Sequence, residues 1–318
     1  MTTLIRFAYL LFACVPVAVA QSQPVRLITG YPPGGAVDAL ARIFAERIAE
    51  NLARPVIVET RAGAAGLIAA QTVKAAAPDG GTFLVAPEGI IVLYPHTVSK
   101  PMFDTLNDFI PVAHLGGYPL GFAIGAAVPA KDLKEYVAWA KRAPANLTYA
   151  TAGSGTTLHF FGLMVGQSTG LPLVHVAYKG VGPALADAIG GQIPTVVLPL
   201  GTLLAQANAG KLRILGHSGG RRSDVAPAIP TFRELGYPIE SSGWFGMFAP
   251  AQTPAAITAR LNDIVVRSLR DDTVRGKLRA LDLEIAEMSP AELAAKLKIE
   301  YDRWGPIVKA SGFSADSQ

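Results

Sequence analysis

Apolar runs alternate with amphipathic segments along most of the chain, and the two patterns predict strands and helices in turn. Apolar runs bounded by glycine, proline or polar residues predict strands at 55–59, 82–86, 173–178, 195–198 and 212–217. Apolar positions three and four residues apart predict helices at 66–77, 133–140, 182–189, 202–208, 255–269, 272–281 and 290–310, with a further strand at 282–286. This alternation predicts an α/β protein with parallel sheets that helices cover on both faces.

A strand that ends at Gly30 is joined to a helix by a turn rich in proline and glycine. Pro32 and Pro33 fix the approach of the chain, and Gly34 and Gly35 leave backbone N–H groups uncovered at the start of the helix. A helix N-terminus carries partial positive charge and unpaired donors, so a carboxylate or phosphate can bind there without lysine or arginine. A βα turn without a ligand has the same pattern, so this turn alone leaves both interpretations open.

The same arrangement occurs a second time, at residues 146–159. A strand leads into a polar turn at 153–156 that contains two glycines, and a helix follows. In open α/β sheets ligands bind outside the carboxyl ends of the strands, where both turns would lie. We therefore predict two lobes that face each other across a cleft and close on a small anion.

The first twenty residues have the pattern of a cleaved signal peptide, which predicts export to the periplasm. Arg6 supplies the positive charge, 7–19 the apolar segment and 18–20 the small-residue cleavage site. A lipoprotein alternative uses 11–14 as the lipid-attachment box, although Phe12 is bulky for that position. Cys14 is the only cysteine, so cleavage after residue 20 would exclude disulfides and thiol catalysis.

Charge and composition narrow the function classes. The net charge is +4, and the basic residues are scattered, so no basic stripe indicates nucleic-acid binding. Residues 109–130 carry no Asp, Glu, Lys or Arg, but prolines and glycines interrupt them. We predict two buried strands around Gly116 and Gly117 there, and no membrane-spanning helix. The five histidines lack metal-ligand spacing, and we expect no metal or cofactor.

Residues 212–220 fit a strand followed by G-x-S-x-G, the pattern of a hydrolase nucleophile elbow with Ser218 as the nucleophile. Such an elbow needs a helix directly after the serine, but 221–227 has no apolar helical face. His217 is the last histidine, so no catalytic base follows in the chain. Serine esterase chemistry is therefore the weaker alternative.

Short motifs that extend from about residue 24 to the C-terminus are together specific, although each alone is weak. They are Tyr-Pro-Pro-Gly-Gly at 31–35 with Asp38, 55–59 with 61–63, 77–80, 149–155, 175–180, and Trp-Phe-Gly at 244–246 with 249–250. In this order they resemble the Bug-type solute receptors, the periplasmic substrate-binding proteins of tripartite tricarboxylate transporters. The resemblance implies a two-lobed class II periplasmic-binding-protein fold with a ligand cleft between lobes joined by crossing strands. Lobe 1 would comprise 24–122 and 243–318, and lobe 2 would comprise 123–242.

The same resemblance implies a function and a site. The protein would be a monomer that captures a small organic carboxylate and delivers it to membrane permease subunits, and a sensory receptor with a signalling partner is the alternative. Backbone N–H groups at 34–37 and 154–156 and bridging water would hold the ligand carboxylate. The candidate ligand-binding residues are Tyr31, Gly34, Gly35, Ala36, Val37, Asp38, Glu88, Gly153, Ser154, Gly155, Thr156, His159, Tyr178 and Leu200.

Several of these residues have a structural alternative. Asp38 is expected to hold the start of the helix in shape, and His159 either contacts ligand or is a hydrogen-bonded structural histidine. Lys179 either attracts the ligand or is simply solvated. Trp244 either forms a wall of the cleft or packs in the hinge.

The chain departs from the pattern of this family at positions that bear on the ligand. Many relatives have hydroxyl residues where this chain has Ala36 and Val37, and a polar turn where it has Glu88. Apolar residues at 197–200 replace a common Asp or Asn. We therefore predict a carboxylate with an apolar or aromatic body. If Glu88 lines the cleft, it would repel a second carboxylate and favour an amine.

Overall fold

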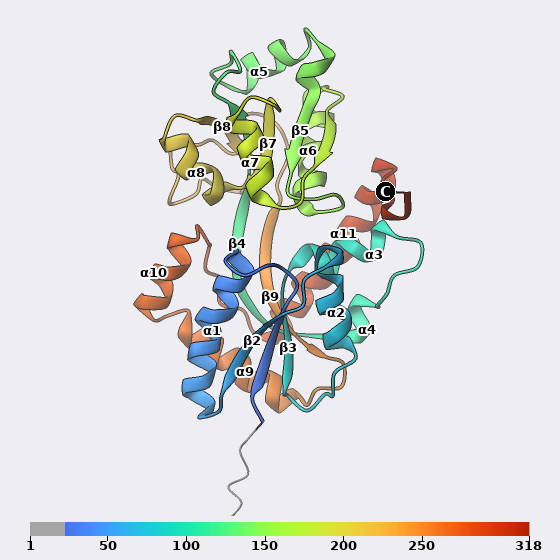
Figure 1. The fold of residues 1–318 in the computed structure, drawn as a ribbon, viewed down its shortest axis with the longest axis vertical. Helices are drawn as coiled ribbons and strands as arrows, with labels where there is room; N and C mark the ends of the chain where they lie inside the picture. Colours follow the sequence, from blue (N-terminus) through green and yellow to red (C-terminus); the bar gives the residue numbers. More distant parts are fainter. Residues whose placement is uncertain (1–22, 318) are drawn as a thin grey trace, which may run out of the picture.

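The structure is a computed structural model that describes residues 23–317 (Figure 1). The predicted signal peptide at 1–20, its lipoprotein alternative and Cys14 lie outside the described residues. Two α/β lobes lie one above the other in Figure 1, and two long strands run between them. Within residues 23–317, no helix has both the length and the apolar character needed to cross a membrane.

Lobe 1 is built on parallel strands joined by helices. Its elements are β1 (Val25–Thr29), α1 (Ala36–Leu52), β2 (Val56–Thr60), α2 (Leu67–Lys74), β3 (Thr82–Pro87), α3 (Tyr94–Thr97), α4 (Thr105–Asp108), β9 (Ser242–Pro250), α9 (Ala255–Ser268), α10 (Asp272–Ala280) and α11 (Pro290–Ser311). Strand β1 lies between β2 and β3 and is parallel to both, and β9 is antiparallel to β3. The alternation predicted from the apolar pattern is present in this lobe.

Both faces of the lobe 1 sheet are buried, because neighbouring residues on each strand enter different apolar clusters. Leu27 and Phe83 pack in the cluster that includes α1, α9 and α10. Ile28 and Leu84, their neighbours in sequence, pack in the cluster that includes α2 and α11. The strands therefore read as continuous apolar runs, as expected for a sheet covered on both sides.

Lobe 2 repeats the strand–turn–helix arrangement. Its elements are α5 (Leu133–Ala140), β5 (Thr148–Thr151), α6 (Thr157–Thr169), β6 (Val174–Ala177), α7 (Val181–Ile189), β7 (Thr195–Pro199), α8 (Leu200–Asn208) and β8 (Leu212–His217). Strand β5 lies parallel to β6 and β7. The Asp132 side chain accepts a hydrogen bond from Glu135 N and caps α5, as its sequence position predicts.

One strand, β4 (Phe109–Gly125), crosses from lobe 1 to lobe 2, and this corrects the prediction of two strands around Gly116 and Gly117. Residues 109–119 of β4 pair with β9, and residues 120–125 pair with β7 and β8. Register shifts near Pro111 and His114 bend β4 without ending it. The prolines and glycines thus mark irregularities in a continuous strand.

Two local predictions also need correction, and one element was not predicted. The segment 282–286 is not a strand, because only Glu284 forms an isolated bridge, with Gly117. The helix predicted at 66–77 begins with a separate 3₁₀ turn at Ala64–Gly66. A π-helical turn at Gly89–Leu93 followed by α3 was not predicted, because all-apolar residues there give no helical periodicity.

Aromatic side chains connect the two lobes away from the crossing strands. Phe160 on α6 packs against Trp304 on α11, with ring centroids 5.8 Å apart. Phe313, just after α11, packs edge-on against Phe160 at 5.7 Å and against His159 at 5.0 Å. The C-terminal segment of lobe 1 therefore contacts the start of α6 in lobe 2.

Candidate ligand-binding site

The N-terminus of α1 presents backbone donors that no side chain caps. Gly35 is the N-cap residue, in an extended conformation, and carries no side chain that could accept from the first helical amides. Residues 32–36 are exposed, and Gly34 has a φ of +88°, which favours glycine. The structure thus places an open, positively polarised helix end at the turn predicted from the sequence.

Asp38 stabilises this turn from within. Its Oδ2 accepts hydrogen bonds from Gly34 N at 3.1 Å and Arg42 Nε at 3.0 Å. The bond from Arg42 is the main reason that the pKa of Asp38 is lowered. Gly34 N is therefore used by the turn itself, so Gly35, Ala36 and Val37 are the candidate donors at this end.

The N-terminus of α6 is organised differently, because its own residues use several of the expected donors. Thr156 Oγ1 caps the helix by accepting from His159 N at 3.3 Å. Gly155 N donates to His159 Nδ1 at 3.2 Å, and Gly153 N donates to Thr151 Oγ1 at 3.3 Å. The two helix ends are therefore not equivalent, contrary to expectation.

His159 forms part of a buried histidine pair. Its ring stacks on that of His175 at 3.9 Å, and His175 Nε2 lies 2.7 Å from Thr151 Oγ1. Burial lowers the pKa of His159 to about 4 and that of His175 to about 3. Both rings are neutral at pH 7, so they shape the second turn and add no positive charge to it.

Glu88 lies between the lobes, and both oxygens of its carboxylate are bonded within the protein, so a contact between Glu88 and ligand stays a prediction. The side chain is 1% exposed. Thr157 Oγ1 in lobe 2 donates to Glu88 Oε1 at 2.5 Å, and Trp244 N on β9 donates to Oε2 at 3.0 Å. Burial raises the pKa of Glu88 to about 7.

Aromatic residues surround Glu88. Tyr31, at the start of the first turn, donates from its hydroxyl to Ala65 O at 3.1 Å. Burial, together with the charge of Glu88, raises the pKa of both Tyr31 and Tyr118. Trp244 is 1% exposed and donates from Nε1 to Glu300 Oε2 at 2.7 Å, so it packs in the hinge.

Two other predicted site residues have side chains engaged within lobe 2. The Tyr178 hydroxyl donates to Asp187 Oδ2 at 2.7 Å, and burial is the main cause of its pKa rising to about 12. Leu200 is fully buried and lies against Gly121 of β4. The Leu200 side chain is therefore packed inside the protein, and its contact with ligand stays a prediction.

Ser218 does not have the environment of a nucleophile. It is fully buried, accepts from Leu120 N at 2.9 Å and donates to Ser241 O. Irregular structure follows it where an elbow requires a helix. The G-x-S-x-G match is thus a structural feature of the chain around β8.

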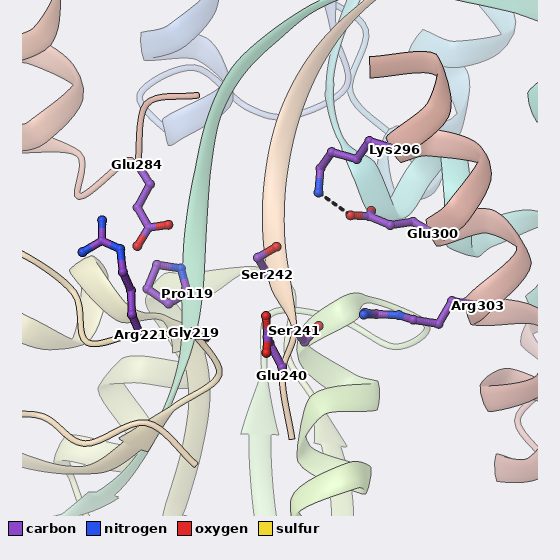
Figure 2. A pocket seen from close by; sticks show the side chains of 11 residues that line it. Pro119, Gly219, Arg221, Glu240, Ser241, Ser242, Glu284, Lys296, Glu300 and Arg303 are labelled. Carbon is purple, nitrogen blue, oxygen red and sulfur yellow. Dashed lines mark hydrogen bonds and ion pairs between the residues drawn. The ribbon is translucent and has the colours of Figure 1, made fainter. Parts of the chain in front are cut away.

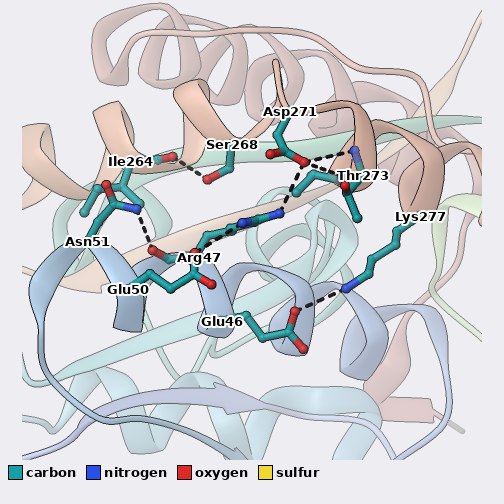
Figure 3. A network of polar contacts seen from close by, with 10 residues as sticks. Glu46, Arg47, Glu50, Asn51, Ile264, Ser268, Asp271, Thr273 and Lys277 are labelled. Carbon is teal, nitrogen blue, oxygen red and sulfur yellow. Dashed lines mark hydrogen bonds and ion pairs between the residues drawn. The ribbon is translucent and has the colours of Figure 1, made fainter.

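A polar cavity of about 320 Å³ lies on the crossing strands, and no sequence prediction included it (Figure 2). Its lining residues come from segments as distant as 119 and 303. No motif connects such positions, so only the fold brings them together.

Comparison with known proteins identifies the family. The sequence model for the tripartite tricarboxylate transporter family receptor, TctC, matches residues 40–313. The chain belongs to this family. Among curated relatives, this TctC-family receptor is 29% identical to protein BugT of Bordetella pertussis, over 92% of this chain and 90% of BugT.

Solved structures agree with this assignment. MatC from Rhodopseudomonas palustris, with bound malate, matches the receptor with a TM-score of 0.81 and 30% identity, over 90% of this chain and 98% of MatC. Rpa4515 of R. palustris, with adipate, matches with a TM-score of 0.83 and 29% identity, over 92% of this chain and 98% of Rpa4515. The predicted Bug-type family and two-lobed periplasmic-binding-protein fold are confirmed.

Proposed function

We propose that this TctC-family receptor captures a small organic carboxylate in the periplasm, by closure of its lobes, and delivers it to a tripartite tricarboxylate-type permease. The observation that carries the proposal is the uncapped N-terminus of α1, whose backbone donors are exposed and which lies at the end of α1 nearest lobe 2 (Figure 1). A carboxylate there would complete the hydrogen bonding of the first helical turn.

The lobe limits 24–122, 123–242 and 243–318 belong to this proposal. The first limit lies close to the point in β4 where its partner changes from β9 to β7, between Pro119 and Leu120. Opening and closing would bend both crossing strands near these positions. Delivery by a monomer follows from the family resemblance.

The ligand that we propose has one carboxylate and an apolar or aromatic body. Malate and adipate in MatC and Rpa4515 support the carboxylate. Ala36 and Val37 offer backbone donors without side-chain hydroxyls, which favours an apolar body.

The energies permit this mode of binding. A hydrogen bond to a charged group contributes about 1.5 to 3 kcal/mol, and a helix end adds roughly 0.3 to 1 kcal/mol. Three or four such bonds, together with burial of the ligand body, can approach the roughly 8 kcal/mol of a micromolar complex after ordering costs. An arginine clamp is therefore not required.

A thermal-shift panel tests the proposal. Aromatic and aliphatic monocarboxylates are compared with succinate, adipate, malate and citrate at matched ionic strength. A true ligand at one hundred times its dissociation constant should raise the unfolding free energy by about 2.7 kcal/mol. A response limited to di- and tricarboxylates would reject the proposed ligand class, and no response to any acid would reject carboxylate capture.

A further inference from the structure

The cavity on the crossing strands contains charged side chains from both lobes (Figure 2). Arg221 and Glu240 come from lobe 2, whereas Glu284, Lys296 and Arg303 come from lobe 1. None of the candidate residues of the cleft lines this cavity. It is therefore a separate feature of the hinge that the proposed carboxylate capture does not use.

Most charges in the cavity are already paired. Lys296 Nζ lies 2.5 Å from Glu300 Oε1, and Glu300 Oε2 accepts from Trp244 Nε1. Arg221 Nη1 lies 2.7 Å from Asp224 Oδ1, and Glu240 Oε2 lies 3.1 Å from Arg233 Nη1. Because these side chains are paired, both the acidic and the basic ones have a weaker electrostatic effect on a ligand in the cavity.

Arg303 is the exception among the lining cations. Within the described part of the chain, its guanidinium forms no ion pair with an acid and lies 5.3 Å from the centre of the Trp304 ring. Figure 2 shows the Arg303 side chain extending from α11 across the cavity toward Ser241. Arg303 is an exposed residue, so its planar group with several N–H donors is available at the solvent-accessible side of the cavity.

Ser241 provides an independent indication of a ligand. It lines the cavity and is 3% exposed, yet its hydroxyl has no hydrogen-bond partner among residues 23–317. Its backbone is held firmly, because Ser241 N donates to Ser218 O and Ser241 O accepts from the Ser218 hydroxyl. A buried hydroxyl without a partner is costly unless a bound group satisfies it.

We propose that Arg303 and Ser241 form a second binding site, in the hinge, for a small oxyanion. The guanidinium donates two parallel hydrogen bonds to such a group, and the Ser241 hydroxyl donates a third. Glu240 and Glu284 also line the cavity and restrict the site to a small anion, because a larger anion would approach these acids and be repelled. Since Arg303 belongs to lobe 1 and Ser241 begins the crossing into β9, the bound anion links the lobes at the hinge.

Titration with inorganic phosphate, against chloride at equal ionic strength, tests this site by calorimetry. Wild-type protein should bind phosphate saturably, and Arg303→Ala should weaken binding by about tenfold or more, because a charged bidentate contact is lost. Ser241→Ala should weaken it severalfold. Its folding should be unimpaired, because the hydroxyl it removes has no partner in the protein.

Two controls separate this site from other sources of phosphate binding. Arg260→Ala removes an exposed positive charge from α9 of the same lobe and should leave the affinity within twofold. Gly35→Asp blocks the α1 terminus, so loss of phosphate binding in that variant would place the anion in the cleft. The proposal would be overturned if Gly35→Asp abolished phosphate binding. It would also be overturned if Arg260→Ala weakened phosphate binding as much as Arg303→Ala does, or if wild-type protein showed no saturable phosphate binding. If Arg303→Ala does not fold, an unchanged affinity in Ser241→Ala is sufficient to overturn it.

Discussion

Gly35 occupies the N-cap position of α1, and replacing it tests whether the backbone donors there bind the ligand. Its φ is −84°, and a Cβ would lie 3.8 Å from Pro32 O, so a side chain can be added without strain. Gly35→Asp should raise the unfolding free energy by a few tenths of a kcal/mol, because aspartate caps the helix. The same carboxylate should weaken ligand binding at least tenfold by occupying the donors.

The matched control for this substitution is Gly35→Ala, which adds the Cβ without an acceptor. It should keep most of the affinity while losing a little stability, because alanine is a poor N-cap residue. Thermal unfolding and calorimetry with the best acid from the panel measure both effects. Equal affinity in the aspartate and alanine variants would show that the carboxylate binds elsewhere. Gly34 is less suitable for this test, because its φ of +88° strains any side chain.

Glu88 should make stability depend on pH. Its folded pKa of about 7 lies above the ordinary glutamate pKa of 4.5, so the folded state retains a proton that the unfolded state loses between these pH values. The contribution of Glu88 to the unfolding free energy therefore decreases as pH rises from about 4.5 to 7. At 1.36 kcal/mol for each pH unit between these two values, the unfolding free energy should change by on the order of 3 kcal/mol.

Glu88→Gln removes this titration and is measured by chemical denaturation from pH 5 to 8. Buried histidines, among them His114 with a pKa of about 4, give the opposite slope, so the difference between wild type and variant is the quantity to compare. Tyr31, Tyr118 and Glu300 also face Glu88 electrostatically and are unchanged in the variant. If the difference in unfolding free energy between wild type and Glu88→Gln did not vary with pH, the raised pKa of Glu88 would be contradicted.

At the scale of single residues, the sequence predicted the donor-rich turn at Gly34 and Gly35. It did not predict the hydrogen-bond partners of the other candidate residues. The Gly34 and Gly35 pattern is local, so a helix end without a cap was predictable from adjacent residues. Glu88 is bonded to residues 69 and 156 positions away, and because those contacts are invisible in sequence, the sequence left open whether its carboxylate faces the ligand. The hydrogen bond from Gly155 N to His159 Nδ1 was not predicted, because the sequence left open whether His159 contacts ligand or is a structural histidine.

At the scale of elements, the packing of α6 on β5 depends on a glycine. A Cβ at Gly162 would lie 2.0 Å from Tyr149 Cε2, and Tyr149 is fully buried with its hydroxyl bonded to His159 O at 2.8 Å. Gly162→Ala should therefore lower the unfolding free energy by roughly 1 to 3 kcal/mol through overpacking. A loss smaller than this in thermal or urea unfolding would mean that α6 can shift without cost.

Gly276 in α10 offers the matched control. It is exposed, and a Cβ there would meet no atom within 4 Å. Gly276→Ala should raise the unfolding free energy by about 0.5 to 1 kcal/mol, because alanine favours the helix. Destabilisation by this substitution as well would indicate a general effect of alanine instead of a clash with Tyr149.

Element prediction succeeded where periodicity was strong and failed where tertiary pairing decides. The amphipathic stripes of α1 and α9 and the apolar run of β1 were sufficient to predict them. Strand β4 was divided in two, because prolines and glycines normally end strands, whereas here β9 continues to pair with the chain past each register shift. Glu284 was assigned to a strand, but only one bridge to Gly117 forms there.

At the scale of the whole molecule, the lobes are joined by more than the two crossing strands. The Glu88–Thr157 hydrogen bond and the packing of Phe313 on His159 and Phe160 both connect lobe 1 to the start of α6. Contacts of this kind favour the closed arrangement and set how readily the cleft opens. They are the feature least accessible to sequence reasoning, since Phe313 lies more than 150 residues from its partners.

Phe313→Ala should therefore weaken ligand binding without removing any group that contacts the ligand. Two aromatic pairs are lost at roughly 0.5 to 1.5 kcal/mol each, which corresponds to a severalfold to about hundredfold shift toward the open form. We expect the dissociation rate to rise and the radius of gyration without ligand, from small-angle scattering, to increase. Ile299→Ala on α11 is the control, because that side chain is 66% exposed. A Phe313→Ala protein that dissociates its ligand at the wild-type rate would show that this contact does not hold the lobes together. Closure would then depend on the other connections, among them the crossing strands, the Glu88–Thr157 hydrogen bond and the packing of Phe160 on Trp304.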